Sequence, residues 1–139
     1  MIIVTLGFLL QTLYPRCGGQ SHSSFITDFT DSMVSRPGIY TENGVQYNPM
    51  REKSPSYLGK IFRGERPIPK KDANLLLARL QKHRIEKFVN ENCFDDTRTN
   101  LANVFSELGF PSVNRDNVAE LCADIVEEIL LNGVYKKQM

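Results

Sequence analysis

Apolar residues recur every three or four positions along most of this chain, which is the spacing of helices that bury one face. Glycines, prolines and capping residues interrupt these stripes at short intervals and divide them into separate segments. We therefore predict a mainly α, single-domain bundle of five or six helices with at most one short β-hairpin. With 41% apolar residues among 139, the chain has enough material for one modest core.

Residues 1–14 are the most apolar stretch. They have no positively charged start and no small-residue cleavage pattern, and they are shorter than the roughly 20 residues of a membrane-spanning helix. We expect no membrane association and interpret them as a core element, for which a helix is favoured although the MIIV start alone suits a strand. Residues 15–24 are rich in Gly, Ser and Pro and predict a linker. The expected division is an apolar element with linker at 1–20 and a helical domain at 21–139.

Two further elements are predicted before the centre of the chain. Ser24 is expected to cap a short helix with Asp28 and Asp31 on its exposed face. Residues 39–49 have the pattern of a β-hairpin, because their Asn-Gly pair supplies the positive φ angles of a two-residue turn. This segment would form the one short β-hairpin that the predicted helical bundle allows.

Residues that typically begin or end helices are most frequent at the centre of the chain. Ser54 can cap a helix whose first residue is Pro55, and Gly64 follows the last apolar positions as a helix-ending glycine does. Two prolines follow; they lack amide donors and favour extended neighbours, so a second helix restarts at about Lys70. The prediction is two helices joined by a tight corner.

The carboxy-terminal half is predicted to be helical throughout. The stripe of residues 73–80 is out of phase with that of 85–89, which indicates a bend near 81–84. Residues 95–97 are expected to cap the next helix, and the Asn-Gly pair at 132–133 is expected to end the last one.

The order Ser-x-Ser-Tyr-Leu-x-Lys-Ile-x-x-Gly-x-Arg begins at Ser54 and ends at Arg66. This segment resembles the recognition helix and exit turn of the Cro/repressor-type (XRE) helix-turn-helix domain, a family of prokaryotic DNA-binding transcription regulators. The resemblance covers residues 54–80, roughly a fifth of the chain. In that family a Gln-x-x-Leu-Ala stretch usually lies just upstream, where this chain has the predicted hairpin, and a glutamate is common at the position of Phe62.

The resemblance implies that the first of the two helices enters the major groove of DNA, where Lys and Arg read guanine and hydroxyl groups reach phosphates. Basic side chains of the turn and of the second helix would then lie along the phosphate backbone. The nucleic-acid-binding residues predicted in this way are Ser54, Ser56, Tyr57, Lys60, Arg63, Arg66, Lys70 and Lys71. The alternative is that Tyr57 belongs to the core and that the cations are ordinary solvated residues.

Charge is unevenly distributed although the net charge is only +1. Residues 51–87 hold eleven Lys or Arg against four acidic residues, and the rest of the chain holds six against twelve. A basic centre with acidic flanks suits an anionic partner. It equally suits ion pairs within the fold or across an oligomer.

Cys17, Cys93 and Cys122 are an odd number without paired spacing, which predicts free or buried thiols in a reducing, cytoplasmic environment. No metal site is expected, since the nearest approach to a ligand pair, Cys17-x4-His22, lies in the predicted linker. Carboxylate pairs such as that at 95–96 are explained by capping or by solvated surface. We predict no catalytic residues, no cofactor and no enzyme activity.

A second class of function fits the same sequence. A small helical adaptor would join a partner protein or form a homodimer through the apolar run at 1–14 and the acidic face of the last helix. The basic centre would then contact an acidic protein or RNA. Small proteins of prokaryotic mobile elements and phage-defence systems have similar size and composition, which is an analogy only. The acidic face consists of Glu120, Asp124, Glu127 and Glu128.

Overall fold

The computed structural model describes residues 1–17, 21–33, 40–42, 45–47 and 53–138. This part of the chain is mainly helical, which confirms the predicted fold class, and it contains seven helices where five or six were expected. In chain order the elements are β1 (Ile2–Val4), α1 (Leu6–Cys17), α2 (His22–Ser32), β2 (Tyr40–Glu42), β3 (Val45–Tyr47), α3 (Pro55–Phe62), α4 (Lys70–Ala78), α5 (Lys82–Asn92), α6 (Asp95–Glu107), α7 (Val118–Asn132) and β4 (Tyr135–Lys137).

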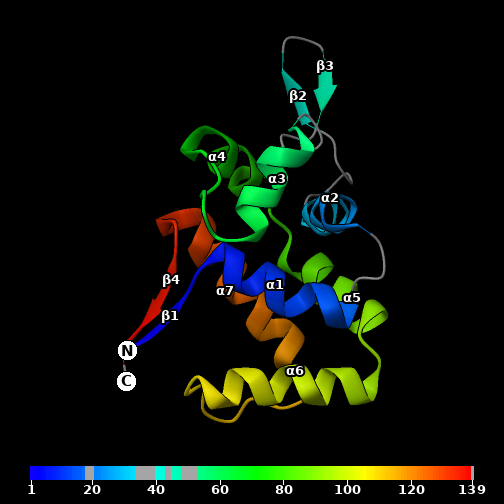
Figure 1. The fold of residues 1–139 in the computed structure, drawn as a ribbon, viewed down its shortest axis with the longest axis vertical. Helices are drawn as coiled ribbons and strands as arrows, with labels where there is room; N and C mark the ends of the chain where they lie inside the picture. The colour runs from blue at the N-terminus through cyan, green and yellow to red at the C-terminus, as the bar shows by residue number, and fades with distance from the viewer. Residues whose placement is uncertain (18–20, 34–39, 43–44, 48–52, 139) are drawn as a thin grey trace.

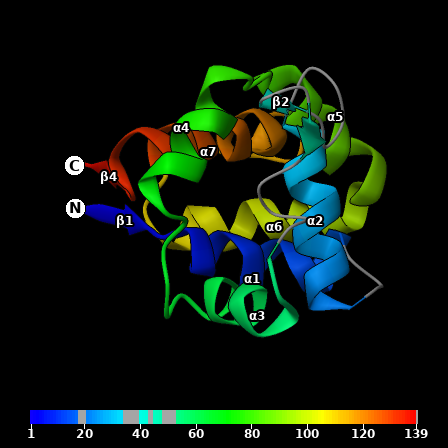
Figure 2. The ribbon, with the colours of Figure 1, turned by 90° about the horizontal axis from the view of Figure 1, so that it is seen from above.

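The last helix, α7, is the centre of the bundle, and α1, α4, α5 and α6 pack against it (Figures 1 and 2). Its buried residues form one broad face, which is wide enough to contact several neighbouring helices. The buried residues of α7 are Val118, Ala119, Cys122, Ala123, Ile125, Val126, Ile129 and Leu130. Through α4 and α1, this helix positions the elements that carry the basic centre.

The apolar run at the start of the chain forms both elements that its sequence allowed, a strand followed by a helix. β1 pairs with β4 in antiparallel register, Val4 opposite Tyr135, so that the two chain ends lie side by side (Figure 1). In α1 the side chains of Leu9, Leu10 and Leu13 are fully buried. The run therefore packs within its own chain.

Residues 15–17 continue α1, so the predicted linker is wrong there. Pro15 has no amide to donate, but it lies near the end of the helix, where it removes only one backbone hydrogen bond. The last residue of the helix, Cys17, is held by a disulfide to Cys93 of the segment after α5. Residues 18–20 lie outside the described part.

α2 begins at His22, two residues before the predicted cap. The cap is Ser21, whose Oγ accepts a hydrogen bond from the Ser24 amide at 3.3 Å. The earlier start brings the His22 ring onto Phe62 of α3, stacked at 4.0 Å between centroids, a favourable aromatic contact. Asp31 was expected to be exposed, but it is 7% exposed because α2 packs against α3 and α5.

The hairpin and the helix break are both confirmed. β2 pairs with β3 in antiparallel register, Glu42 opposite Val45, and the Asn-Gly turn lies outside the described residues. The bend predicted near 81–84 is a break between α4, which ends at Ala78, and α5, which begins at Lys82.

The helix predicted after residues 95–97 begins at Asp95, but those side chains do not cap it. Its N-cap is Phe94, which forms no side-chain cap. Asp95 and Asp96 lie in the first turn, where a negative charge interacts favourably with the helix dipole. α7 ends at Asn132, and its C-cap Gly133 has a left-handed φ of 80°, so the predicted Asn-Gly stop is confirmed.

The predicted cap of α3 is confirmed, since Ser54 Oγ accepts a hydrogen bond from the Tyr57 amide at 3.2 Å. Ser54→Ala is expected to lower the free energy of unfolding by about 1 kcal/mol, because one amide at the helix start loses its partner. Chemical denaturation measures this loss. Ser56→Ala is the control, an exposed serine of the same turn that should change stability by less than about 0.5 kcal/mol. Equal losses in the two variants would contradict the capping role.

Candidate nucleic-acid interface

The corner between α3 and α4 is fixed by its own backbone. α3 ends at Phe62 with Arg63 as its C-cap, and Gly64 takes a left-handed φ of 74°. The Gly64 amide donates to the Ile61 carbonyl (3.0 Å), and the Glu65 amide donates to the Lys60 carbonyl (2.9 Å). These two bonds form a Schellman motif, which confirms the predicted glycine stop.

α1 touches this corner at one point of close backbone contact. A Cβ atom on Gly7 would lie 2.4 Å from Gly64 Cα and 2.5 Å from the Gly64 nitrogen, distances at which something must shift. The two glycines therefore let the start of α1 and the exit turn of α3 meet directly. No local sequence signal indicated this contact.

Tyr57 links the two sides of the corner. Lys53 Nζ lies 5.3 Å and Arg66 Cζ 4.8 Å from the centroid of its ring, and both are cation–π contacts. Lys53 also pairs with Asp72 of α4 at 2.9 Å. The Tyr57 hydroxyl is buried and has no hydrogen-bond partner among the described residues. The Tyr57 ring therefore contacts Lys53 and Arg66. Its hydroxyl is not exposed, whereas the resemblance had implied that it reaches a phosphate.

The other predicted contact residues lie on the surface. Ser54 and Ser56 are exposed at the start of α3. Five cations are exposed along the last turn of α3, the exit turn and the first turn of α4, which follow one another in Figure 1. We call this set the corner cations: Lys60, Arg63, Arg66, Lys70 and Lys71.

One corner cation already has an anionic partner. Arg63 Nε and Nη2 donate to the two carboxylate oxygens of Glu65, both at 3.1 Å. The hydrogen bond raises the pKa of Arg63 and lowers the pKa of Glu65. Both side chains are more than half exposed, so solvent screens the pair and a phosphate can compete for the guanidinium. In the sequence Glu65 was only one of the four acidic residues of 51–87, and its pairing with Arg63 was not predicted.

Cations farther along the chain form ion pairs inside the fold. Lys82 Nζ lies 3.0 Å from Asp124 and 3.6 Å from Glu127 of α7, and the hydrogen bond to Asp124 is the main reason that the pKa of Lys82 is raised. Lys87 pairs with Glu91 one turn along α5 at 3.8 Å. Ion pairs within the fold thus account for part of the basic centre, at Lys82 and Lys87. Lys82 also offsets part of the acidic face of α7.

α2 packs against α3, although 22 residues, 33–54, separate the two helices in the chain. In a helix-turn-helix domain the helix before the recognition helix is joined to it by a short turn. Here the β2–β3 hairpin lies in the connection, and it extends beyond the helices at one end of the molecule (Figure 1). Any resemblance to that domain therefore rests on α3 and its exit turn.

The surfaces named for the adaptor alternative are largely used within the chain. Of the apolar run at 1–14, Met1 and Ile3 remain exposed, at 62% and 50%. Most of the other apolar side chains there belong to the core. On α7, Asp124 and Glu127 pair with Lys82.

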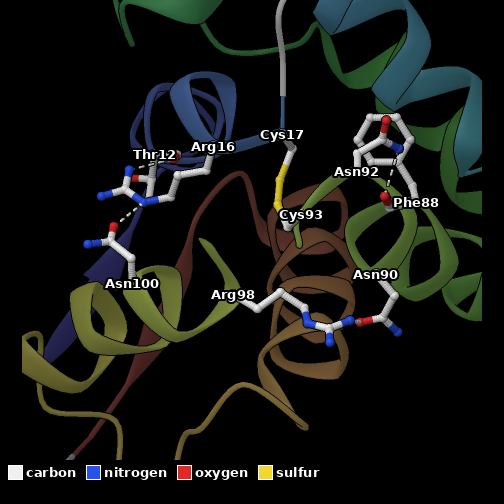
Figure 3. The surroundings of a disulfide bond; sticks show 9 residues. All are labelled: Thr12, Arg16, Cys17, Phe88, Asn90, Asn92, Cys93, Arg98 and Asn100. Atoms are coloured by element: carbon white, nitrogen blue, oxygen red, sulfur yellow. Dashed lines mark hydrogen bonds between the residues drawn. A yellow bond between two sulfur atoms is a disulfide. The ribbon is translucent and has the colours of Figure 1, made fainter. Parts of the chain in front are cut away.

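The prediction that the cysteines are unpaired is wrong for two of them. Cys17 and Cys93 form a disulfide between the ends of α1 and α5, with Cα atoms 5.0 Å apart (Figure 3). They are 76 residues apart in the chain, so spacing gave no signal. Cys122 is a free, buried thiol, and burial raises its pKa to about 12. Disulfides are typical of oxidising compartments, so this bond argues against the reducing environment expected from the sequence.

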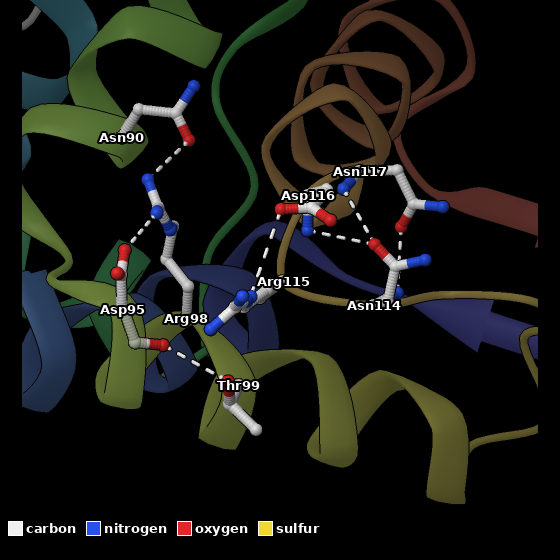
Figure 4. A network of polar contacts seen from close by, with 8 residues as sticks. All are labelled: Asn90, Asp95, Arg98, Thr99, Asn114, Arg115, Asp116 and Asn117. Atoms are coloured by element: carbon white, nitrogen blue, oxygen red, sulfur yellow. Dashed lines mark hydrogen bonds and ion pairs between the residues drawn. The ribbon is translucent and has the colours of Figure 1, made fainter.

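Polar groups near the disulfide have structural partners. Arg16 at the end of α1 donates to the Asn100 side chain of α6 (2.7 Å) and to the Thr12 carbonyl (2.9 Å) (Figure 3). Arg98 joins α6 to α5 by donating to the Asn90 side chain at 3.2 Å (Figure 4). These bonds fix α6 against the helices that the disulfide connects.

Polar side chains at the starts of α6 and α7 also have structural partners. Asp95 pairs with Arg98 in the first turn of α6. In the turn before α7, the Asn114 side chain accepts hydrogen bonds from the Asp116 amide (2.8 Å) and the Asn117 amide (3.2 Å) (Figure 4). Over the described ranges, no three His, Cys, Asp or Glu side chains gather as metal ligands would, and no helix is long and apolar enough to cross a membrane.

Comparisons of this chain with family models, with curated proteins and with solved structures find no significant match.

Proposed function

We propose that this protein is a non-enzymatic, DNA-binding regulatory protein that contacts duplex DNA through α3, its exit turn and the start of α4. The observation that supports this most is the set of five exposed corner cations. The Schellman motif, the contact between Gly7 and Gly64 and the cations over Tyr57 hold this corner in one geometry. A preformed group of positive charges neutralises several phosphates with little ordering cost.

An α-helix with its side chains is about 10–12 Å across, which matches the roughly 12 Å width of the major groove, so α3 can lie in it. Ser54 and Ser56 at its amino end would contact phosphates, while Lys60 and Arg63 would reach base edges. The remaining corner cations would follow the phosphate backbone. In this arrangement Arg63 exchanges its partner Glu65 for DNA.

Arg63→Ala is expected to weaken DNA binding about fivefold or more, and Glu65→Ala is expected to strengthen it by releasing Arg63. Fluorescence anisotropy with a duplex of about 30 base pairs and mixed sequence measures both effects across a salt series. Each phosphate contact adds about −0.9 to the slope of log affinity against log salt, so Lys71→Ala, at a side chain expected to lie along the phosphate backbone, should make that slope shallower by about this amount.

Arg115→Ala is the matched control, because Arg115 is an exposed arginine of the turn between α6 and α7, away from the corner. It should leave the affinity and the salt slope unchanged. Affinity that does not depend on salt, or no binding at about 50 mM salt, would sink the proposal. A regulator that acts in a reducing cytoplasm would have the Cys17–Cys93 bond reduced, so the titrations are carried out with and without reductant.

The adaptor alternative is supported by the exposure of Met1 and of Ile3 in β1. A size measurement on the purified protein separates the two functions. A defined dimer that binds DNA supports the regulator, whereas aggregation that only a co-expressed partner prevents supports the adaptor.

A further inference from the structure

A cleft of about 530 Å³ lies between the exit turn of α3, the first turn of α4 and the end of α7. The start of α1 forms its fourth side, and Figure 1 shows these four elements around one region of the molecule. Volumes of about 300 to 1,000 Å³ are typical of sites for small organic molecules. The cleft is thus large enough for a ligand of that kind.

The walls of the cleft are mainly apolar. They include Leu6, Ile68, Ala73, Ile129, Leu130 and Leu131. Leu131 is 55% exposed although it follows two buried residues of α7, so apolar surface faces water here. Covering such surface is favourable by about 25 cal/mol per Å². An apolar chain is therefore the part of a ligand that these walls would hold.

The charged groups that line the cleft are all positive. They are Arg66 and Lys70, and no acidic side chain is among the lining residues. The first turn of α4 lies at the same edge, and its N-cap, Pro69, makes no side-chain cap bond. The helix dipole adds positive potential at that edge, and the acidic residue of the same turn, Asp72, is paired with Lys53. The charge pattern favours an anionic group beside the apolar chain and disfavours a cationic one.

We propose that this cleft binds an apolar molecule that carries a single carboxylate, such as a medium-chain fatty acid. Its chain covers Leu130 and Leu131, and its carboxylate accepts hydrogen bonds from Arg66 and Lys70. Both cations also belong to the corner proposed to bind DNA, so the ligand is expected to weaken DNA binding. Ligand binding itself is measured without DNA, and the two proposals can therefore fail separately.

Isothermal titration calorimetry with decanoate, 1-decanol and decyltrimethylammonium, each below its micelle concentration, tests the charge requirement. The three molecules share one chain and differ in their head group. Decanoate should bind at least about fivefold more tightly than the alcohol, and the ammonium compound should bind most weakly. No binding of decanoate, or equal binding of all three, would overturn the proposal.

Two pairs of variants locate the ligand. Lys70 and Lys71 are adjacent exposed lysines of α4, and only Lys70 lines the cleft, so Lys70→Ala should lower decanoate affinity about fivefold and Lys71→Ala should not. In the same way Leu131→Gln should weaken binding, while Leu108→Gln, at an exposed leucine after α6, should not. Equal losses within either pair would show that decanoate binds elsewhere. The two lysine variants should weaken DNA binding alike, which keeps the two proposals distinct.

Discussion

Reduction of the Cys17–Cys93 disulfide is expected to lower the free energy of unfolding by about 4 kcal/mol. The bond closes a loop of 76 residues, and a cross-link across a long loop restricts the unfolded chain strongly. It also joins the ends of α1 and α5, which contact each other in the core. Urea denaturation with and without reductant measures the difference. A loss of this size is a large fraction of the stability of an ordinary domain.

The double variant Cys17→Ala/Cys93→Ala provides the control, because its stability should no longer respond to reductant. Thiol counting gives an independent check. Unreduced protein should show one thiol when unfolded, that of Cys122, and reduced protein should show three. In the folded state Cys122 should resist alkylation at pH 8, because burial raises its pKa to about 12 and keeps the thiol protonated. Three free thiols in unreduced protein would show that the disulfide does not form.

Gly7→Ala is expected to destabilise the protein by about 3 kcal/mol, because the new Cβ would overlap the backbone of Gly64. The clash involves a Cα and an amide nitrogen at 2.4 and 2.5 Å, and neither atom belongs to a flexible side chain that can move away. The start of α1 and the exit turn of α3 would have to separate. The same change should therefore also disturb the corner cations and lower DNA affinity. Thermal unfolding measures the first effect and anisotropy the second.

Gly59→Ala is the matched control within the neighbouring helix. A Cβ on Gly59 would meet only the end of the Arg63 side chain, at 3.2 Å, which can rotate away. Alanine is also the better helix former by about 1 kcal/mol, so this variant should be as stable as the original protein or more stable. If Gly7→Ala unfolds at the same temperature as Gly59→Ala, the close contact between the two glycines is not present.

Local signals were sufficient for the corner between α3 and α4. The serine cap, the helix-ending glycine and the prolines act over a few residues, so the sequence predicts this geometry without knowledge of the fold. The same reasoning located the helix break before Lys82 and the end of α7 at Gly133. It also identified the corner cations as candidates, but not the Glu65 side chain that pairs with Arg63.

Contacts between distant residues could not be predicted in this way. β4 has a short and mostly polar sequence, and it is a strand because β1 from the other end of the chain pairs with it. The stacking of the His22 ring on Phe62 joins α2 to a helix that follows much later in the chain. The cleft likewise combines residues from four separate elements.

The sequence by itself determined the helical class, the hairpin and the corner that carries the cations. Each of these depends on interactions between residues that lie only a few positions apart in the chain. The tertiary structure decided that Cys17 meets Cys93, that Gly7 meets Gly64, and which cations remain exposed. These features depend on how helices pack around α7, and packing brings together residues whose separation in the sequence carries no information about their distance in space.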